Sequence, residues 1–262
     1  ALQTNAGAGE YNNAFGWQAL KTNTTGTENQ AFGISAMLFN TTGSYNNAMG
    51  SNTLRTNTTG EQNVAIGYRT MFANTTASNN TALGSRVLET NTTGANNVAV
   101  GRASMFSNTT GSTNVAVGVD ALNNTTTANN NIAVGHASLY SNTTGANNVA
   151  FGYTALYSST TAGQNTAVGY QAGYAVTTGA NNVCIGMYAG YGSAVGAPNL
   201  TTGSSNVYIG GYASPSASSN TYEISIGYNT LGKGAGTAYI SAGGGATYNG
   251  ANTTTWATTS DR

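Results

Sequence analysis

The chain is poor in charge, because lysine and arginine together number seven of its 262 residues and aspartate and glutamate also number seven. Between Asp120 and Glu223 the sequence holds no charged residue at all. A nucleic-acid partner requires clustered cations that neutralise phosphates, so we expect no nucleic-acid binding. No apolar run approaches the roughly 18 to 20 residues of a membrane span, so we expect no membrane insertion.

Cysteine and histidine are each present only once. A lone Cys184 cannot form an internal disulfide, and its place in a column of alanines predicts a buried, inert thiol. His136 has no cysteine or second histidine to complete a metal site. We expect it to be a surface residue, and the other interpretation is an ion held on the axis of a trimer. The sequence therefore predicts no metal and no cofactor.

A repeat dominates what the chain does contain. The phrase Asn-x-Ala-φ-Gly, where φ is a large apolar residue, returns every seventeen residues from Gly16 to Gly186 without insertion or deletion. Such a fixed period is typical of stacked structural units and not of an ordinary globular domain. With the glycine counted as position 0, position 4 is Leu or Met in nine consecutive units, position 15 is almost always Ala, and position 16 is large and apolar.

Seventeen residues are too few for a pair of helices. The alternation at positions 14 to 16 predicts a β-strand, and a second short strand is expected at positions 2 to 5. Asn-Thr-Thr-Gly between them is turn chemistry, although Asn-Thr-Thr also matches an N-glycosylation acceptor. The prediction is an all-β parallel β-solenoid, or β-roll, over residues 1–228, with a loop insertion at about 191–205 and a Gly- and Thr-rich distal element at 229–262.

Stacking would place equal positions of successive units above one another at about 4.8 Å. Position 13 would then form a ladder of side-chain amides that fixes the register. The small residue at position 15 is expected on an outer face, where it allows close approach by another surface. Together with a thin core, this predicts a homotrimer, with a single-chain solenoid as the alternative. The ladder residues are Asn29, Asn46, Asn63, Asn80, Asn97, Asn114, Asn131, Asn148, Asn165 and Asn182.

Tyrosine is concentrated toward the C-terminus, where thirteen of sixteen lie from Tyr140 onward. Aromatic rings on a neutral surface rich in Asn and Thr suit carbohydrate recognition, whereas the same rings could instead fill a widened core or a subunit interface. The candidates for contact with a receptor or glycan are Tyr188, Tyr191, Tyr208, Tyr212, Tyr239, Tyr248 and Trp256.

Catalytic constellations are missing from the sequence. Glycoside hydrolysis requires two carboxylates about 5 to 10 Å apart, and the acids here are spread over different repeats, where surface positions are expected. The glycine-rich stretches lack the context of a phosphate-binding loop. We therefore expect no catalytic residue within the array. The acids are Glu10, Glu28, Glu61, Glu89, Asp120, Glu223 and Asp261.

Three features resemble known families. The seventeen-residue array, as in residues 165–174, resembles repeats of bacteriophage tail fibres. The phrase at 63–67 is similar to the one that builds the β-roll of YadA-type trimeric adhesin heads. The C-terminal residues 256–262 resemble the start of the intramolecular chaperone domain of endosialidase-type tailspikes, and this resemblance makes Ser260 the candidate nucleophile for self-cleavage. The chain opens part-way through a repeat, so we expect a segment of a longer protein.

These resemblances imply a non-catalytic structural fibre and receptor-binding protein of a phage tail, located in the virion tail and therefore extracellular. Its implied partners are two further copies of itself, other tail proteins upstream, and a glycan or protein of the host cell surface. Two alternatives stay open. One is the head of a trimeric bacterial surface adhesin, and the other is an ice-binding β-solenoid that orders water on columns of threonine.

Overall fold

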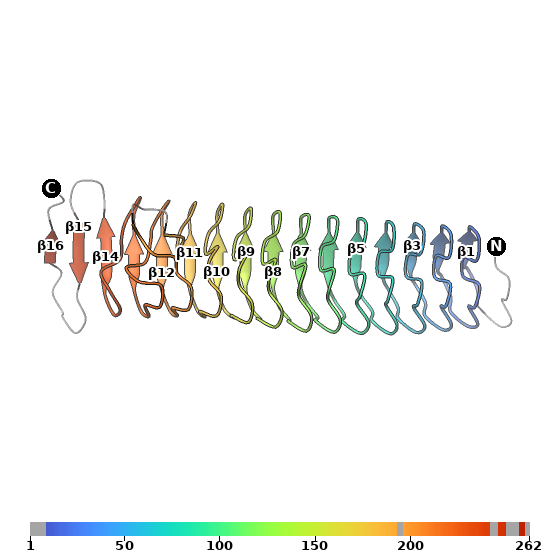
Figure 1. Cartoon of the computed structure of the whole chain (residues 1–262). Coiled ribbons are helices and arrows are strands. Elements are labelled where there is room, and N and C mark those ends of the chain that lie inside the picture. The colour runs from blue at the N-terminus through green and yellow to red at the C-terminus, as the bar shows by residue number, and fades with distance from the viewer. Residues whose placement is uncertain (1–8, 193–195, 242–245, 250–256, 260–262) are drawn as a thin grey trace. The chain divides into compact units, whose positions relative to one another are not determined.

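Short β-strands joined by turns make up the chain, and no helix occurs among the residues that the structure describes. The structure is a computed structural model that describes residues 9–192, 196–241, 246–249 and 257–259. The chain divides into two compact units between Asn131 and Ile132. In the first unit the strands are β1 (Asn13–Phe15), β2 (Gln30–Phe32), β3 (Asn47–Met49), β4 (Val64–Ile66), β5 (Thr81–Leu83), β6 (Val98–Val100) and β7 (Val115–Val117) (Figure 1).

The second unit continues the same pattern and then departs from it. Its strands are β8 (Ile132–Val134), β9 (Val149–Phe151), β10 (Thr166–Val168), β11 (Val183–Ile185), β12 (Val207–Ile209), β13 (Ile224–Ile226), β14 (Ala238–Ser241), β15 (Ala246–Asn249) and β16 (Ala257–Thr259). From β8 to β11 each strand follows the one before it after seventeen residues.

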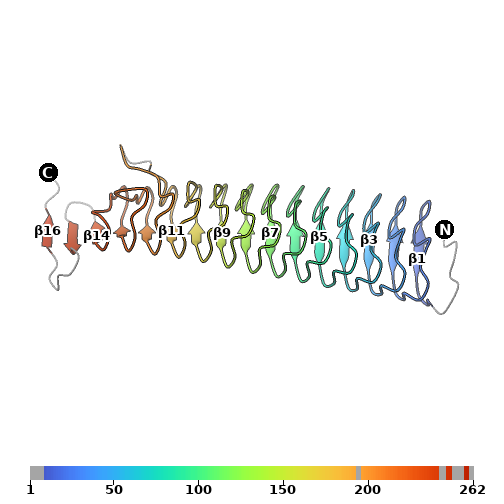
Figure 2. The same cartoon turned by 60° about the horizontal axis from the view of Figure 1, so that its bottom comes forward.

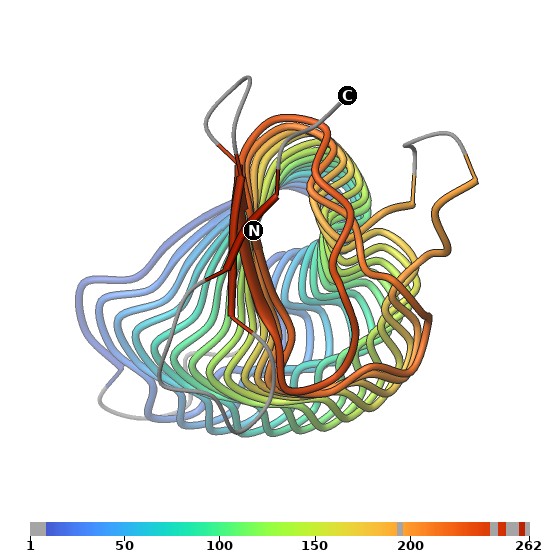
Figure 3. The same ribbon diagram turned by 90° about the vertical axis from the view of Figure 1, so that its left-hand side faces the viewer.

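Each strand pairs with the next along the chain within its unit, in parallel throughout the first unit and from β8 to β14 in the second. In β5 and β6, for example, Thr81 lies opposite Val98 and Ala82 opposite Ala99, so partners are separated by seventeen residues. The end-on view of Figure 3 shows successive turns of each unit lying over one another. The predicted fold class, an all-β parallel β-solenoid with turns of about seventeen residues, is confirmed for each unit.

The second strand predicted at positions 2 to 5 is wrong. These residues form turns, and left-handed backbone occurs at positions 2, 4 and 12 of the repeat, as at Arg69 (φ 53°), Met71 (φ 52°) and Gln62 (φ 56°). Non-glycine residues seldom adopt this conformation, but it bends the chain sharply. A turn can therefore close in seventeen residues with only three in a strand. Backbone bonds still join the turns here, since the Met71 amide donates to the Val87 carbonyl at 2.9 Å.

The buried and exposed faces of the strand are the reverse of the predicted ones. Ala82 at position 15 is fully buried inside the turn, whereas Leu83 at position 16 is 46 % exposed. Met71 and Leu88 at position 4 fill the interior from the other wall. Because these long side chains occupy the narrow space, the turns with Leu or Met at position 4 leave room only for a small residue at position 15. The expectation that the alanines form an outer contact face is therefore wrong.

The asparagines at position 13 lie inside the turns and link them. The Asn63 Oδ1 atom accepts the backbone N–H of Asn80 at 3.0 Å and its side-chain amide at 3.2 Å, while the Asn63 Nδ2 group donates to the Ala77 carbonyl at 2.9 Å. Each side chain thus satisfies backbone groups of neighbouring turns that water cannot reach. All ten predicted ladder residues are buried.

A second asparagine ladder runs along position 7, where the sequence indicated only turn chemistry. The Asn57 Nδ2 group donates to the Asn40 Oδ1 atom at 2.7 Å, and the Asn74 Nδ2 group donates to the Asn57 Oδ1 atom at 2.8 Å. These are the asparagines of the Asn-Thr-Thr phrases, and their side chains are fully buried. A glycan cannot be attached at these nitrogens in the folded chain.

This second ladder is interrupted where another residue replaces asparagine. The Asn142 Oδ1 atom in the second unit has no hydrogen-bond partner, and neither has the hydroxyl of Ser159 at the same position of the next turn. In the first unit the Asn108 Oδ1 atom and the Thr125 hydroxyl likewise have no hydrogen-bond partner. A buried polar group without a partner costs about 1 to 3 kcal/mol, so these sites weaken the stack.

Replacing Ser159 by asparagine is expected to stabilise the second unit by about 1 kcal/mol, because the new amide would donate to the Asn142 Oδ1 atom and to the Ala162 carbonyl. Chemical denaturation followed by circular dichroism measures the change. Ser158→Asn, one residue earlier and partly exposed, is the matched control and should leave stability within about 0.5 kcal/mol. A lower stability for S159N would contradict the ladder geometry.

The insertion in the second unit is shorter than predicted. Leu200 donates its amide to the Gly190 carbonyl at 3.0 Å, and Tyr191 forms an isolated antiparallel bridge with Asn199. The extra residues therefore lie between Gly190 and Leu200, where the chain leaves the turns in Figure 2. Residues 200–205 belong to the regular turn, since the Thr177 amide donates to the Thr201 carbonyl at 2.8 Å.

The repeat also ends later than the predicted boundary at residue 228. Strand β14 pairs in parallel with β13, with Ile224 opposite Ala238, so one shortened turn follows Gly227. Strand β15 then pairs with β14 in antiparallel fashion, and β16 pairs with β15 in the same way. The apolar alternation of Ala238, Tyr239 and Ile240 preserves the strand even though no glycine of the repeat phrase follows it.

Candidate functional site

Two files of aromatic rings run along the outside of the second unit. At position 1 His136 stacks on Tyr153 and Tyr153 on Tyr170, with ring centroids 5.2 Å apart in both pairs. At position 5 Tyr140, Tyr157 and Tyr174 stack with the same 5.2 Å spacing. The spacing follows from the repeat, because equal positions of successive turns lie one strand separation apart. His136 is thus a surface residue at the end of one file.

Ring orientation changes next to the insertion. In the regular turns the planes differ by only 4° to 11°, so neighbouring rings cover one another's faces. Tyr188 lies at 75° to Tyr170 and Tyr191 at 65° to Tyr174. The two files meet here, with the Tyr188 and Tyr191 centroids 5.8 Å apart, and Tyr212 continues the stack at 5.2 Å. Partial burial, then the neighbouring phenols of Tyr157 and Tyr191, raise the pKa of Tyr174.

The predicted aromatic candidates thus separate into two groups. Tyr188, Tyr191 and Tyr212 come together in one partly exposed cluster, which we call the tyrosine junction. Tyr208 is fully buried, so its prediction as a ligand contact is wrong. Tyr239 is 5 % exposed and lies under the Lys233 ammonium, 4.6 Å from the ring centroid. The Tyr248 side chain, Trp256 and Ser260 lie outside what the structure describes.

A buried carboxylate explains the position of Tyr208. Glu223 occupies position 13, where earlier turns carry a ladder asparagine, and it is fully buried. It accepts hydrogen bonds from the Tyr208 hydroxyl at 2.9 Å, the Ser216 hydroxyl at 2.7 Å and the Gly234 amide at 2.8 Å. The surface position predicted for this acid is wrong. Its donors are neutral and surround it, so the group closes the interior of the turn and leaves no open side for a substrate.

Alkaline pH is expected to destabilise the second unit through Tyr208. Burial, and then the Glu223 carboxylate, raise the pKa of this phenol above the ordinary value of 10.0. A raised folded-state pKa means that its stabilising effect is complete below about pH 10 and is lost as the pH rises further, because only the unfolded chain releases the proton. The free energy of unfolding should therefore fall above about pH 10.

The Tyr208→Phe variant isolates this effect. Its free energy of unfolding should be lower at neutral pH, since one buried donor to Glu223 is lost, but should decline less steeply between about pH 10 and pH 11 than that of the wild type. Denaturation curves at several pH values provide the comparison. Equal slopes for the two proteins would show that Tyr208 ionises as freely as an exposed tyrosine.

The thiol of Cys184 is fully buried in the alanine column, and burial raises its pKa to about 12. It therefore stays protonated and inert at neutral pH, since the thiolate is the reactive form. Among the described residues, no group of three or more His, Cys, Asp or Glu side chains could hold a metal ion.

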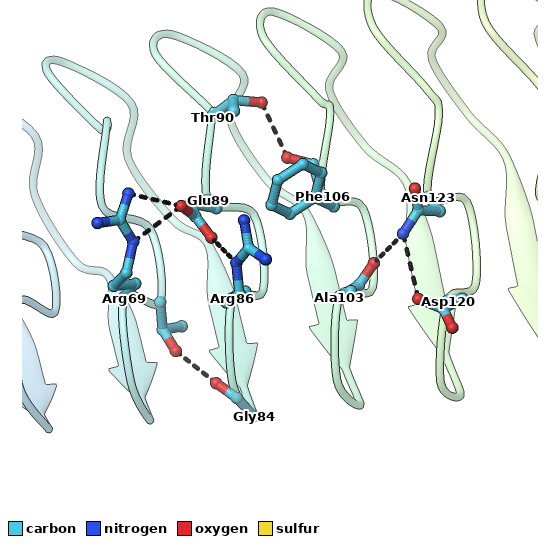
Figure 4. Close-up of polar contacts among 10 residues, drawn as sticks. Arg69, Gly84, Arg86, Glu89, Thr90, Ala103, Phe106, Asp120 and Asn123 are labelled. Atoms are coloured by element: carbon cyan, nitrogen blue, oxygen red, sulfur yellow. Dashed lines mark hydrogen bonds and ion pairs between the residues drawn. The ribbon is translucent and has the colours of Figure 1, made fainter.

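Arginine and acidic side chains of the first unit form ion pairs, of which Figure 4 shows those around Glu89. Glu89, only 5 % exposed, lies between Arg69, 2.7 Å from one carboxylate oxygen, and Arg86, 2.6 Å from the other. Arg102 pairs with Asp120 at 2.8 Å. The prediction of a surface position for Glu89 is wrong, because both guanidinium groups cover it. These ion pairs neutralise each carboxylate, so the pairs hold turns together and present no acid–base couple.

Comparisons with known proteins give no relative: no family model, no curated protein and no solved structure matches the chain. In the part of the chain that the structure describes, no helix is long and apolar enough to cross a membrane.

Proposed function

We propose that this chain is a structural fibre and receptor-binding protein of a bacteriophage tail, that it works as a homotrimer outside the cell, and that it has no catalytic activity. The observation that carries the proposal is the seventeen-residue register within each unit, in which backbone bonds and the position-13 asparagine ladder join successive turns and the interrupted position-7 ladder adds further bonds. Such stacking resists bending and gives reach, which is what a fibre provides.

The distribution of carboxylates supports a non-catalytic role. Glu10 and Glu28 lie on adjacent turns and Glu61 lies two turns further on, and all three are exposed to water, whereas a catalytic carboxylic acid is usually set in a desolvating pocket. Glu89 and Asp120 are each bound to arginine, and Glu223 is enclosed by neutral donors.

Receptor recognition is assigned in this proposal to the tyrosine junction. Tyr188 and Tyr191 are turned by 75° and 65° relative to the rings of the preceding turn, and all three phenols of the junction remain partly exposed. The surrounding sequence has no charged residue between residues 121 and 222. Uncharged aromatic surfaces suit sugar C–H faces and hydroxyl groups, so a glycan of the host cell surface is the partner that fits this chemistry.

Binding of the fluorescently labelled protein to bacterial cells tests the function. Host-type cells should retain the wild-type protein, and Tyr188→Ala with Tyr191→Ala should reduce retention at least tenfold. Tyr157→Ala, in a regular turn of the same file, is the matched control and should bind like the wild type. Absence of binding to every strain of a broad panel, or equal binding of the junction variant, would contradict the proposal.

An adhesin head is the second candidate, because its resemblance rests on the same repeat phrase. The sequence that flanks this segment distinguishes the two: a chaperone domain favours the fibre, whereas a coiled-coil stalk and membrane anchor favour the adhesin. Ice binding is less well supported. The Thr58 hydroxyl donates to the Thr75 carbonyl at 3.0 Å and is only partly exposed, whereas Thr59 of the same pair is exposed. A flat lattice of paired hydroxyls does not form.

A further inference from the structure

The outward side of the sheet in the first unit carries one apolar column along its described length, beside position 14, which is Asn, Gln or Thr in four strands and Val in three. Position 16 carries a large apolar residue on every strand from β1 to β7, and we call this column the outer apolar file. Phe15 is 76 % exposed and Met49 47 % exposed. Continuous apolar patches of more than a few hundred Å² on a soluble protein mark interaction surfaces. The file is made of Phe15, Phe32, Met49, Ile66, Leu83, Val100 and Val117.

Opposite charges lie on the two sides of this file. The corner that precedes the strand, at positions 11 and 12, carries three acids and no cation, and we call it the acidic corner. It consists of Glu10, Glu28 and Glu61, all exposed. The surface that follows the strand, at positions 1, 2 and 5, carries five cations and two acids, and we call it the basic corner. It consists of Lys21, Arg55, Arg69, Arg86, Arg102, Glu89 and Asp120.

Positions 2 and 5 belong to one surface, because Arg69 at position 2 and Glu89 at position 5 of the next turn are 2.7 Å apart. The three-residue strand lies between the two corners along the chain, and it spans about 10 Å. The first unit therefore has a neutral strip, apolar along position 16, bordered by an acidic corner with a net charge of three negative and a basic corner with a net charge of three positive.

We propose that these corners pair between copies of this chain, with the acidic corner of one copy against the basic corner of the next and the outer apolar file covered between them. The inference rests on the proposed homotrimer and names the surfaces through which it assembles. A cyclic assembly joins two different edges of the subunit at every interface, and edges of opposite charge are what such a head-to-tail contact requires.

A second copy fits this surface better than another partner because its period is the same. In the turn from Gly16 to Gly33 both Lys21 and Glu28 occur, and in the turn from Gly50 to Gly67 both Arg55 and Glu61 occur. If two copies lie parallel and in register, Lys21 of one copy is therefore at the same turn as Glu28 of the other, and Arg55 is at the same turn as Glu61. A polyanion such as nucleic acid would be attracted by one corner and repelled by the other.

Charge reversal tests the pairing in the full chain. In sedimentation experiments at low salt, Glu28→Lys with Glu61→Lys should weaken assembly at least tenfold, because both corners are then positive. Lys21→Glu with Arg55→Glu should weaken it similarly. The variant with all four reversals should assemble like the wild type, since each interface again joins opposite charges. High salt should reduce the differences among the variants.

Lys233→Glu, a reversal in the second unit, is the control and should leave assembly unchanged. Glu28→Gln with Glu61→Gln removes charge without reversal and should give an intermediate loss, which keeps the test valid if a reversed variant folds poorly. A wild-type trimer that is indifferent to every reversal would overturn the corner pairing and leave the proposed fibre intact. A monomeric wild type would overturn both the pairing and the homotrimer, whereas cell binding tests recognition separately.

Discussion

Replacing Gly101 by alanine is expected to lower the free energy of unfolding by more than about 4 kcal/mol, the range reached only by severe core or backbone damage. Gly101 is the position-0 glycine between β6 and β7, with φ at +119°. A Cβ atom there would lie 2.5 Å from the carbonyl oxygen of Gly118 and 2.6 Å from its carbonyl carbon. The obstructing atoms are backbone of the next turn, so relief requires separation of two hydrogen-bonded turns.

Gly234→Ala is the matched control for this effect. Gly234 has the same φ of +119°, but nothing lies within 4 Å of where its Cβ would be. Its substitution should cost only the conformational strain, about 1 to 2 kcal/mol. Chemical denaturation of both variants separates strain from close approach. Equal losses for the two would show that the glycines recur for their backbone angle and not for the spacing of the turns.

The second large effect is expected at Asn74, in the middle of the position-7 ladder. Its Nδ2 group donates to the Asn57 Oδ1 atom at 2.8 Å and to the Ala77 carbonyl at 3.1 Å, and its Oδ1 atom accepts from Asn91 at 3.1 Å. Asn74→Ala removes three buried hydrogen bonds and leaves the Asn57 Oδ1 atom without a donor, so a loss of about 3 to 5 kcal/mol is expected.

Asn79→Ala provides the comparison for Asn74. Asn79 belongs to the same turn but is exposed and has a left-handed backbone at φ 62°, so its replacement should cost no more than about 1 kcal/mol. Hydrogen exchange adds a local measurement, because amides of the turns around Asn74 should lose protection in the Asn74→Ala variant before those around β1. Similar stabilities for the two variants would show that the ladder contributes little.

The sequence was sufficient for the class of fold and for its register. With a constant interval between glycines, only one register places equal positions of successive turns opposite one another. The observed Ala82–Ala99 pairing has this register. The buried asparagines at position 13 could also be predicted, because a polar residue kept in every repeat of a stack needs partners that the same stack supplies.

The direction of the strand faces could not be predicted from alternation alone. Alternation shows that the side chains at positions 14 and 16 lie on the other face of the strand from the side chain at position 15, but it does not show which face is buried. That choice depends on the opposite wall, where Met71 and Leu88 leave room only for Ala82. The left-handed backbone conformation could not be predicted either, because Arg69 and Met71 are not residue types that indicate a positive φ.

The functional surfaces were only partly predictable. Tyr188, Tyr191 and Tyr212 all lie near the insertion in the sequence, which was enough to place them together. Glu223 carried an overlooked signal, since it replaces an asparagine in a column that is buried elsewhere. Had that column been extended to residue 223, both the acid and its partner Tyr208 would have been placed in the interior. The charge on the two corners required knowledge of which positions face outward.

A disulfide test addresses the central claim, the direct stacking of turns seventeen residues apart. Thr59 and Thr76, exposed at position 9 of adjacent turns, are replaced together by cysteine, and the native Cys184 stays inert because it is buried. Strand spacing of about 4.8 Å lies within the range that a disulfide can bridge. Mild oxidation should form the intrachain bond in Thr59→Cys with Thr76→Cys, detected by mass spectrometry, but not in Thr59→Cys with Thr93→Cys, two turns apart. Failure of the first pair, or equal reaction of both, would contradict the account.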